Sequence, residues 1–199
     1  MIRISINEIL RKLFHLSSSI IPLTYWFVVK DRNSMIIILL LLTIISLIIE
    51  YLRRNYIGRI QNIFQNNLSS ILRDKELEGQ LTGATWMLIG FTLTVLLFKI
   101  EIAVVALLFL SVGDSVAAIV GSAFPIGKIW NKSILGSCAG VLFCVFFGII
   151  IINNSLPSVL IILGAISAML IELVPSRIND NFSIPLFSAF TMHALRGIL

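Results

Sequence analysis

An aspartate lies within an apolar stretch of this chain, shortly ahead of two lysines. The stretch runs from Ser111 to Gly136 and contains Asp114, Lys128 and Lys132. A charged carboxylate is costly to place in hydrocarbon, so an ionisable residue in a membrane segment is a functional-site candidate. Asp114 has no basic residue within one helical turn, which favours a bound divalent ion or a proton-accepting role. The sequence therefore predicts a phosphate-and-metal site at a membrane surface.

Small and basic residues surround this aspartate. Gly113 and Gly121 bracket two turns of small residues, which would let a neighbouring helix or a ligand approach the backbone closely. Lysines beside the free N–H groups of a helix start are typical of an anion site. A nucleotide triphosphate is the anion that would also bring Mg²⁺. The residues expected to bind it here are Gly113, Ser115, Gly121, Lys128, Lys132, Ser133 and Gly136.

The elements that must position these residues are membrane helices. The chain has 199 residues, of which 58% are hydrophobic and 13% are charged, which is typical of an integral membrane protein. No strand-like alternation competes with helix, so we expect an all-α, polytopic helical bundle forming a single domain over residues 1–199. About seven apolar segments are long enough, or nearly so, to span a bilayer: 13–29, 35–50, 81–98, 101–120, 134–152, 156–173 and 183–198.

The distribution of Lys and Arg sets the expected orientation. Most of them lie in the N-terminal region and in loops 51–80, 121–133 and 174–182, which predicts a cytoplasmic N-terminus. The opposite face carries only Lys30, Arg32, Lys99 and Arg196. The segment 51–80 has apolar residues at helical spacing and should lie as an amphipathic helix on the cytoplasmic leaflet, either as a linker or as a lid.

The formal net charge is +5, but the basic residues are spread through short loops rather than along a stripe. Anionic lipid head groups and a nucleotide triphosphate are therefore the expected partners, and nucleic acid is not. The oligomeric state is left open.

This topology brings several acids to one face. Glu50, Asp114 and Glu172 each lie late in a helix that runs towards the cytoplasm, and the loop 174–182 adds Asn179, Asp180 and Asn181. Simpler explanations exist for most of them. Arg53 and Arg54 could neutralise Glu50, Arg177 could reach Glu172, and an Asn-Asp-Asn run is often a turn that caps a helix.

In order and spacing, several short motifs resemble those of the CTP-dependent lipid kinases. This group contains dolichol kinase, phytol kinase and the CTP-dependent diacylglycerol kinase, and is related to phosphatidate cytidylyltransferases. The resemblance covers most of the chain. Its motifs are Arg11-Lys12-x-x-His15, Glu50-x-x-Arg53, Leu81-Thr-Gly83-Ala-Thr-Trp86, Gly113-Asp114-Ser115-x-Ala117-x-x-x-Gly121, Lys132-Ser-x-x-Gly136, and Glu172 followed by Asn179-Asp180-Asn181-x-x-x-Pro185.

The resemblance implies transfer of the γ-phosphoryl group of CTP to the hydroxyl of a membrane lipid alcohol at the cytoplasmic face. We expect Asp114, Lys132 and Asp180 to be catalytic, with Asp114, Glu172 and Asp180 as candidate Mg²⁺ ligands. Asn179 and Asn181 join the expected nucleotide-binding residues. The alternatives are a phosphatidate cytidylyltransferase that makes CDP-diacylglycerol and, more remotely, a small membrane carrier. The residues do not identify the lipid alcohol, which could be a polyprenol, diacylglycerol or a phytol-like alcohol.

Overall fold

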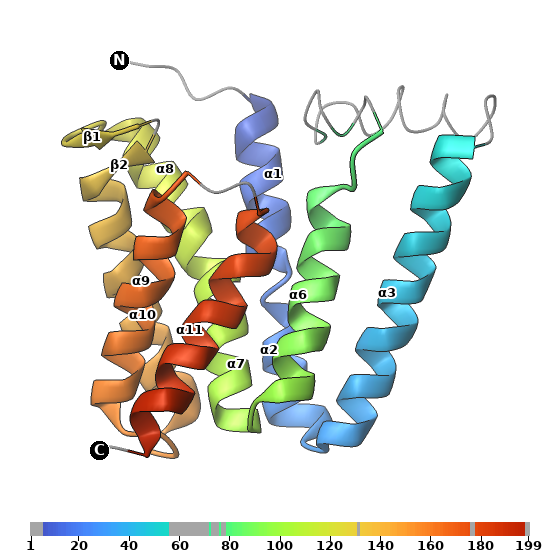
Figure 1. Ribbon diagram of the computed structural model, residues 1–199. Coiled ribbons are helices and arrows are strands. Elements are labelled where there is room, and N and C mark those ends of the chain that lie inside the picture. The colour runs from blue at the N-terminus through green and yellow to red at the C-terminus, as the bar shows by residue number, and fades with distance from the viewer. Residues whose placement is uncertain are drawn as a thin grey trace.

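The computed structural model describes residues 6–55, 72, 76, 79–130, 132–175 and 178–197. These parts of the chain form a bundle of upright helices (Figure 1). In chain order the elements are α1 (Ile6–Ser17), α2 (Ile20–Thr24), the π-helical η1 (Tyr25–Val29), α3 (Arg32–Asn55), α6 (Gly83–Leu97), α7 (Ile100–Leu108), the π-helical η3 (Phe109–Asp114), α8 (Ser115–Ala123), β1 (Lys128–Ile129), β2 (Lys132–Ser133), α9 (Ile134–Ile152), α10 (Ser158–Leu173) and α11 (Asp180–Arg196).

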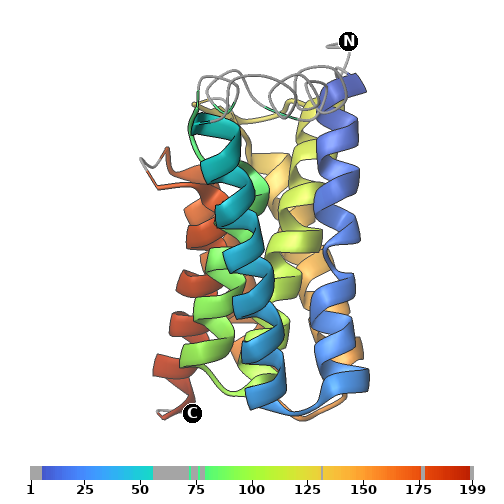
Figure 2. The same cartoon turned by 90° about the vertical axis from the view of Figure 1, so that its right-hand side faces the viewer.

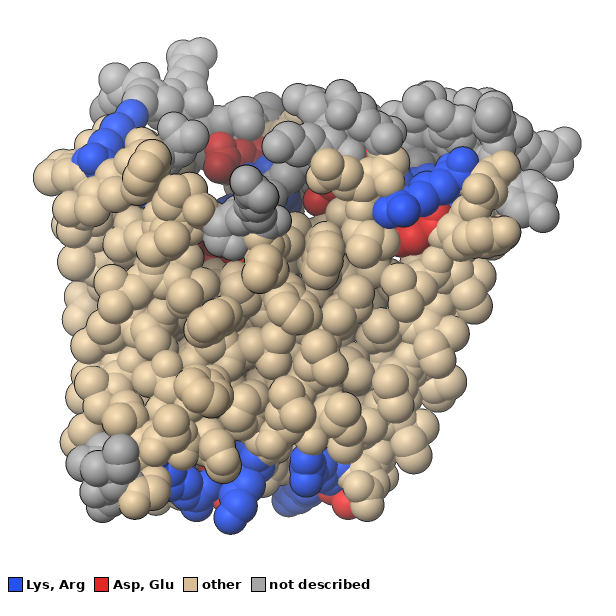
Figure 3. All heavy atoms as spheres, viewed as in Figure 1, with Lys and Arg blue, Asp and Glu red and all other residues tan. Residues whose placement is uncertain are grey.

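The predicted all-α class is confirmed. Within the described parts of the chain, three helices are long and apolar enough to cross a membrane, Arg32–Asn55, Ile100–Ala123 and Ile134–Ile152, and two shorter apolar helices accompany them. The count of seven spans and the orientation of the N-terminus stay predictions. On the face seen in Figure 3, charged side chains gather at the two ends of the bundle and leave an uncharged band between them. This pattern is what a bilayer core requires of a protein surface.

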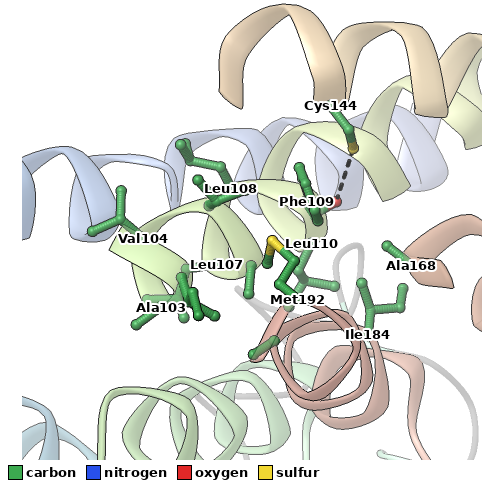
Figure 4. Close-up of a cluster of buried hydrophobic side chains, with 14 of the residues drawn as sticks. Ala103, Val104, Leu107, Leu108, Phe109, Leu110, Cys144, Ala168, Ile184 and Met192 are labelled. Atoms are coloured by element: carbon green, nitrogen blue, oxygen red, sulfur yellow. Dashed lines mark hydrogen bonds between the residues drawn. The ribbon is translucent and has the colours of Figure 1, made fainter. Parts of the chain in front are cut away.

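The centre of the bundle is the continuous helix formed by α7, η3 and α8. Its apolar window is 83% buried, whereas that of α3 is only 22% buried. Phe109 and Leu110 are fully buried, and Figure 4 shows Met192 and Ile184 of α11 among the side chains around them. Asp114 is therefore carried by the most enclosed of the three long apolar helices.

A π-helical turn interrupts this central helix just before Asp114. The turn spans Phe109–Asp114, and such turns leave backbone carbonyls without their usual α-helical partner. The thiol of Cys144 donates to the carbonyl of Phe109 at 3.8 Å (Figure 4). A Cβ atom at Gly113 would lie 2.4 Å from the Cys144 Sγ, so glycine lets α9 approach the turn.

The first predicted segment, 13–29, differs in detail from the structure. The helix already begins at Ile6 and is broken at Ser18 and Ser19. The hydroxyl of Ser18 lies 2.9 Å from that of Ser111 in η3, so a hydrogen bond joins this break to the central helix. Helix α1 is thereby held beside Asp114. Of the predicted amphipathic segment 51–80, α3 takes residues up to Asn55, and most of the remainder lies outside the described residues.

The loop between α8 and α9 is a small hairpin. Strands β1 and β2 pair antiparallel, with Lys128 opposite Ser133. Ser133 also caps α9, because its hydroxyl accepts from the N–H of Gly136 at 3.4 Å. Figure 1 places this hairpin at the same end of the bundle as the starts of α1 and α11. The predicted convergence of these segments is confirmed.

Candidate active site

Asp114 forms a buried ion pair with a lysine from the first helix. The Lys12 ammonium lies 2.6 Å from the Asp114 Oδ2 and also donates to the Asp114 backbone carbonyl at 3.4 Å. Only 7% of each residue is exposed. We expected a metal ion or a proton to satisfy this carboxylate, since no base lies near it in sequence. Lys12 from α1 supplies a cation that lies 102 positions away.

Further contacts fix α1 against the central helix. The hydroxyl of Ser115 donates to the backbone carbonyl of Lys12 at 3.2 Å and to that of Ser111 at 2.7 Å. The His15 Nδ1 lies 4.0 Å from the Asp114 Oδ2. The acid is thus bounded by two basic side chains of one helix, and Ser115 holds that helix in register.

A second ion cluster forms around Lys132 of β2. Its ammonium lies 2.9 Å from the Asp180 Oδ2 and 3.1 Å from the Glu172 Oε1, and it donates to the Glu172 backbone carbonyl. The hydroxyl of Ser137 donates to the Glu172 Oε2 at 3.1 Å. Partial burial opposes the charge on Lys132, but the two carboxylates outweigh it and raise the lysine pKa above its ordinary value. Lys132 is therefore a fixed cation that joins β2, α10 and α11.

The two clusters face one cavity of about 330 Å³, which is close to the lower end of small-molecule sites. Among the described residues, its wall holds four basic side chains, Arg11, Lys12, Lys128 and Lys132, and four acidic ones, Glu8, Asp114, Glu172 and Asp180. Their formal charges sum to zero, and Lys12 and Lys132 are already paired with carboxylates. A phosphate group that enters this cavity therefore shares the Lys and Arg side chains with these carboxylates or brings a cation of its own.

The structure brings most of the expected site residues to this cavity. Those that line it are Asp114, Gly121, Lys128, Lys132, Ser133, Glu172 and Asp180. Gly113, Ser115 and Gly136 are not among its lining residues. Gly136 contacts α8, where a Cβ atom would lie 2.3 Å from the Ala117 carbonyl oxygen. Close helix packing accounts for Gly113 and Gly136, and Ser115 hydrogen-bonds to the backbone of α1. The role of these three residues in binding stays a prediction.

The Asn-Asp-Asn run divides between three tasks. Asn179 caps α11, because its side chain accepts from the N–H of Asn181 at 3.0 Å. Asp180 reaches the cavity and Lys132. Asn181 points elsewhere and donates to the Gly83 carbonyl at 2.8 Å. The turn-and-cap interpretation is therefore confirmed, alongside the position of Asp180 in the cavity wall.

Glu50 has the structural explanation that its neighbours suggest. Arg53 donates to the Glu50 Oε2 from Nη2 at 2.6 Å and from Nε at 3.1 Å. The Glu50 Oε1 accepts from the Thr82 N–H at 2.8 Å and from the Thr85 hydroxyl at 3.2 Å. This carboxylate ties the end of α3 to the start of α6. Arg177, the other cation considered for Glu172, lies outside the described residues.

The donor set for a metal ion is dispersed. Among the residues that the structure describes, no three His, Cys, Asp or Glu side chains gather closely enough to hold an ion. Asp114 is paired with Lys12, and Lys132 stands between Glu172 and Asp180. Mg²⁺ commonly takes one or two carboxylates and completes its shell with phosphate oxygens and water, so a single acid of this wall fits that role. The three metal-binding assignments stay predictions.

Sequence reasoning did not place Glu8, Arg11, Lys12 or His15 in the site. Arg11, Lys12 and His15 were visible only as a motif near the chain start, without a partner. Their spacing puts Lys12 and His15 within one helical turn of each other, and both meet Asp114. The i,i+3 spacing of Lys12 and His15 was the only feature of the sequence that could have indicated that both side chains contact one partner.

Comparison with known proteins bears on this site. An uncharacterized protein of Rickettsia prowazekii is 34% identical to the chain, over 88% of each sequence. The chain belongs to the same family as this protein. No protein-family model and no solved structure matches it.

Two distant relatives carry a described activity. CTP-dependent diacylglycerol kinase 1 of Saccharomyces cerevisiae is 26% identical, over 95% of this chain and 73% of the kinase. Its counterpart in Eremothecium gossypii is 25% identical, over 95% of this chain and 67% of the kinase. These similarities support membership of the CTP-dependent lipid kinase family.

Proposed function

We propose that this protein transfers the γ-phosphoryl group of CTP to the hydroxyl of a membrane lipid alcohol. The observation that carries the proposal is the charged cavity at one end of an apolar bundle, where Asp114 meets Lys12 and Lys132 meets Asp180. Phosphoryl transfer depends mainly on positioning and on electrostatic stabilisation. A fixed set of cations at a membrane surface supplies both.

The donor side of the reaction falls to the basic side chains. Lys128 and Lys132 lie on the hairpin, Arg11 and Lys12 lie on α1, and all four line the cavity. They would neutralise the triphosphate oxygens as negative charge shifts towards the leaving group. A magnesium ion that arrives with the nucleotide would be held by Asp114, with help from Asp180 or Glu172, and would offset phosphate charge.

In the transfer step, the lipid hydroxyl oxygen forms a bond to the γ-phosphorus. The bond between that phosphorus and the β–γ bridging oxygen breaks, and CDP leaves with the electron pair. The hydroxyl proton passes to a carboxylate, for which Asp114 is the favoured acceptor and Asp180 the alternative. We assign the site to the cytoplasmic face, because most Lys and Arg residues of the chain lie in the segments expected on that side.

The test is product analysis with purified protein in lipid nanodiscs. CTP labelled at the γ-phosphate should yield labelled lipid phosphate and CDP, with ATP as the control donor. Asp114→Asn should abolish transfer, whereas Asp31→Asn, an exposed acid outside the site, should not. Release of pyrophosphate would instead identify a cytidylyltransferase, and full activity of Asp114→Asn would contradict the assigned role.

A further inference from the structure

A second cavity, of about 250 Å³, lies beside the charged one and has a different character. Its wall combines apolar side chains such as Phe14 of α1 and Ile49 of α3 with hydroxyls of Ser46 and Thr85. The two hydroxyls lie 2.6 Å apart. No lysine is among the described residues that line it. This cavity suits an amphipathic group rather than a polyphosphate.

The two cavities share a wall. Arg11 lines both of them. On α1, Lys12 faces the charged cavity while His15 lines the second one, and at the start of α11 Asp180 and Asn181 divide in the same way. His15 also lies 4.0 Å from the Asp114 carboxylate. A group held in the second cavity is therefore separated from the charged cavity by single side chains.

The described charges of the second cavity do not form a cluster of cations for an anionic head group. Arg11 and His15 line it together with Glu50 and Glu76. Arg53 neutralises Glu50 from a distance of 2.6 Å, and both Glu50 oxygens already accept hydrogen bonds. A lipid phosphate would meet the carboxylate of Glu76 with one arginine nearby, whereas an uncharged hydroxyl can both donate and accept among the hydroxyl side chains. The wall thus favours a neutral, hydroxyl-bearing ligand.

The cavity lies where α1 and α3 diverge. Figures 1 and 2 both show α3 close to η1 at one end of the bundle, and α3 farther from α1 towards the other end. Phe14 and Ile49 are 46% and 42% exposed there. The outer face of α3 is apolar and exposed along its length, as lipid-facing helices are. The apolar part of the cavity is therefore continuous with a surface that contacts hydrocarbon.

We infer that this second cavity is the acceptor site, which binds the head of an uncharged lipid alcohol entering sideways from the bilayer between α1 and α3. This inference rests on the proposed function, because the bound hydroxyl is the one that would receive the phosphoryl group. The polar wall positions the hydroxyl beside the charged cavity, and the tail lies along Phe14 and Ile49. Entry from the side spares the tail any passage through water.

Photolabelling tests this site without any need for turnover. Wild-type protein in nanodiscs is irradiated with a long-chain alcohol that carries a diazirine near its hydroxyl, and the labelled peptides are mapped. Label in α1, α3 and the start of α6 is expected, and label confined to other helices would overturn the inference. Excess unlabelled alcohol should suppress the label. Stronger suppression by phosphatidate at equal mole fraction would contradict an uncharged ligand.

A variant that fills the second cavity tests the same site by enzyme kinetics. Ala84 lines the second cavity at the start of α6, and Ala84→Phe should raise the KM for the lipid alcohol by about tenfold or more through lost apolar contact. The KM for CTP should stay unchanged. The matched control is Leu142→Phe on α9, where the side chain is 70% exposed. An unchanged lipid KM in Ala84→Phe, or a raised KM for CTP alone, would overturn the assignment.

A third substitution covers failure of folding. Ile49→Trp alters the same cavity from a partly exposed position, so it tests the site if Ala84→Phe does not fold. The experiments also distinguish the two proposals. Label in the second cavity without CTP-dependent transfer would support the lipid site and contradict the kinase activity. CTP-dependent transfer with label in other helices would support the kinase activity and contradict the lipid site.

Discussion

Removal of the Lys12 side-chain charge should destabilise the protein through Asp114. The two charged atoms lie 2.6 Å apart and are almost fully enclosed. At an effective dielectric constant of about 20 their attraction is on the order of 6 kcal/mol, and desolvation of both ions offsets much of it. Lys12→Met keeps the length of the side chain but leaves a buried carboxylate unpaired, at a cost of about 3–5 kcal/mol.

A double-mutant cycle separates the pair from its surroundings. Asp114→Asn and Lys12→Met are made singly and together, and unfolding free energies are measured in mixed micelles with increasing denaturing detergent. The double variant should recover much of the stability lost in Lys12→Met, because no buried charge remains unpaired. Phosphoryl transfer should nevertheless stay absent. A Lys12→Met protein as stable as the wild type, or additive single effects, would refute the buried ion pair.

Three further predictions follow from the packing and the ion clusters. Gly136→Ala should lower the free energy of unfolding by about 1–3 kcal/mol, because the added Cβ would overlap a backbone oxygen of α8. The control Cys138→Ala, at an exposed site of the same helix, should have little effect. Equal stabilities of the two variants would contradict the packing of α8 against α9. Arg53→Leu should lower the free energy of unfolding by about 3–5 kcal/mol, because it leaves the buried Glu50 carboxylate without its arginine. The exposed Arg54→Leu should cost far less, as measured by thermal unfolding. A larger loss in Arg54→Leu would contradict the assignment of Arg53 as the partner of Glu50. Because the pKa of Lys132 is raised in the folded state, its ion cluster stabilises the fold at any pH below the ordinary lysine pKa. This stabilisation is lost as the pH rises through the raised pKa. The difference in melting temperature between wild type and Lys132→Met should therefore persist at neutral pH and vanish only at strongly alkaline pH.

Local patterns in the sequence predicted much of this fold. Apolar runs marked where the helices lie, since burial in hydrocarbon requires an internally hydrogen-bonded backbone. The contact of Glu50 with Arg53 follows from i,i+3 spacing on one helix. The alternation of helix direction also brought Asp114, Lys132, Glu172 and Asp180 to one end, where they line a single cavity.

Long-range contacts could not be predicted in this way. The pairing of Lys12 with Asp114 depends on how α1 packs against the central helix, and no local pattern encodes that packing. The π-helical turn before Asp114 likewise depends on close approach of α9, through Gly113 and Cys144. Small residues near the aspartate suggested ligand binding, but their spacing serves helix packing equally well.

The central claim is tested most directly by following both products of a single reaction. Purified protein in nanodiscs that contain an uncharged lipid alcohol is mixed with CTP labelled at its γ-phosphate. The account predicts label in the lipid and an equal amount of CDP, with little transfer from ATP and none in Asp114→Asn. Pyrophosphate with a cytidine-bearing lipid, or no nucleotide turnover with any lipid alcohol, would contradict it.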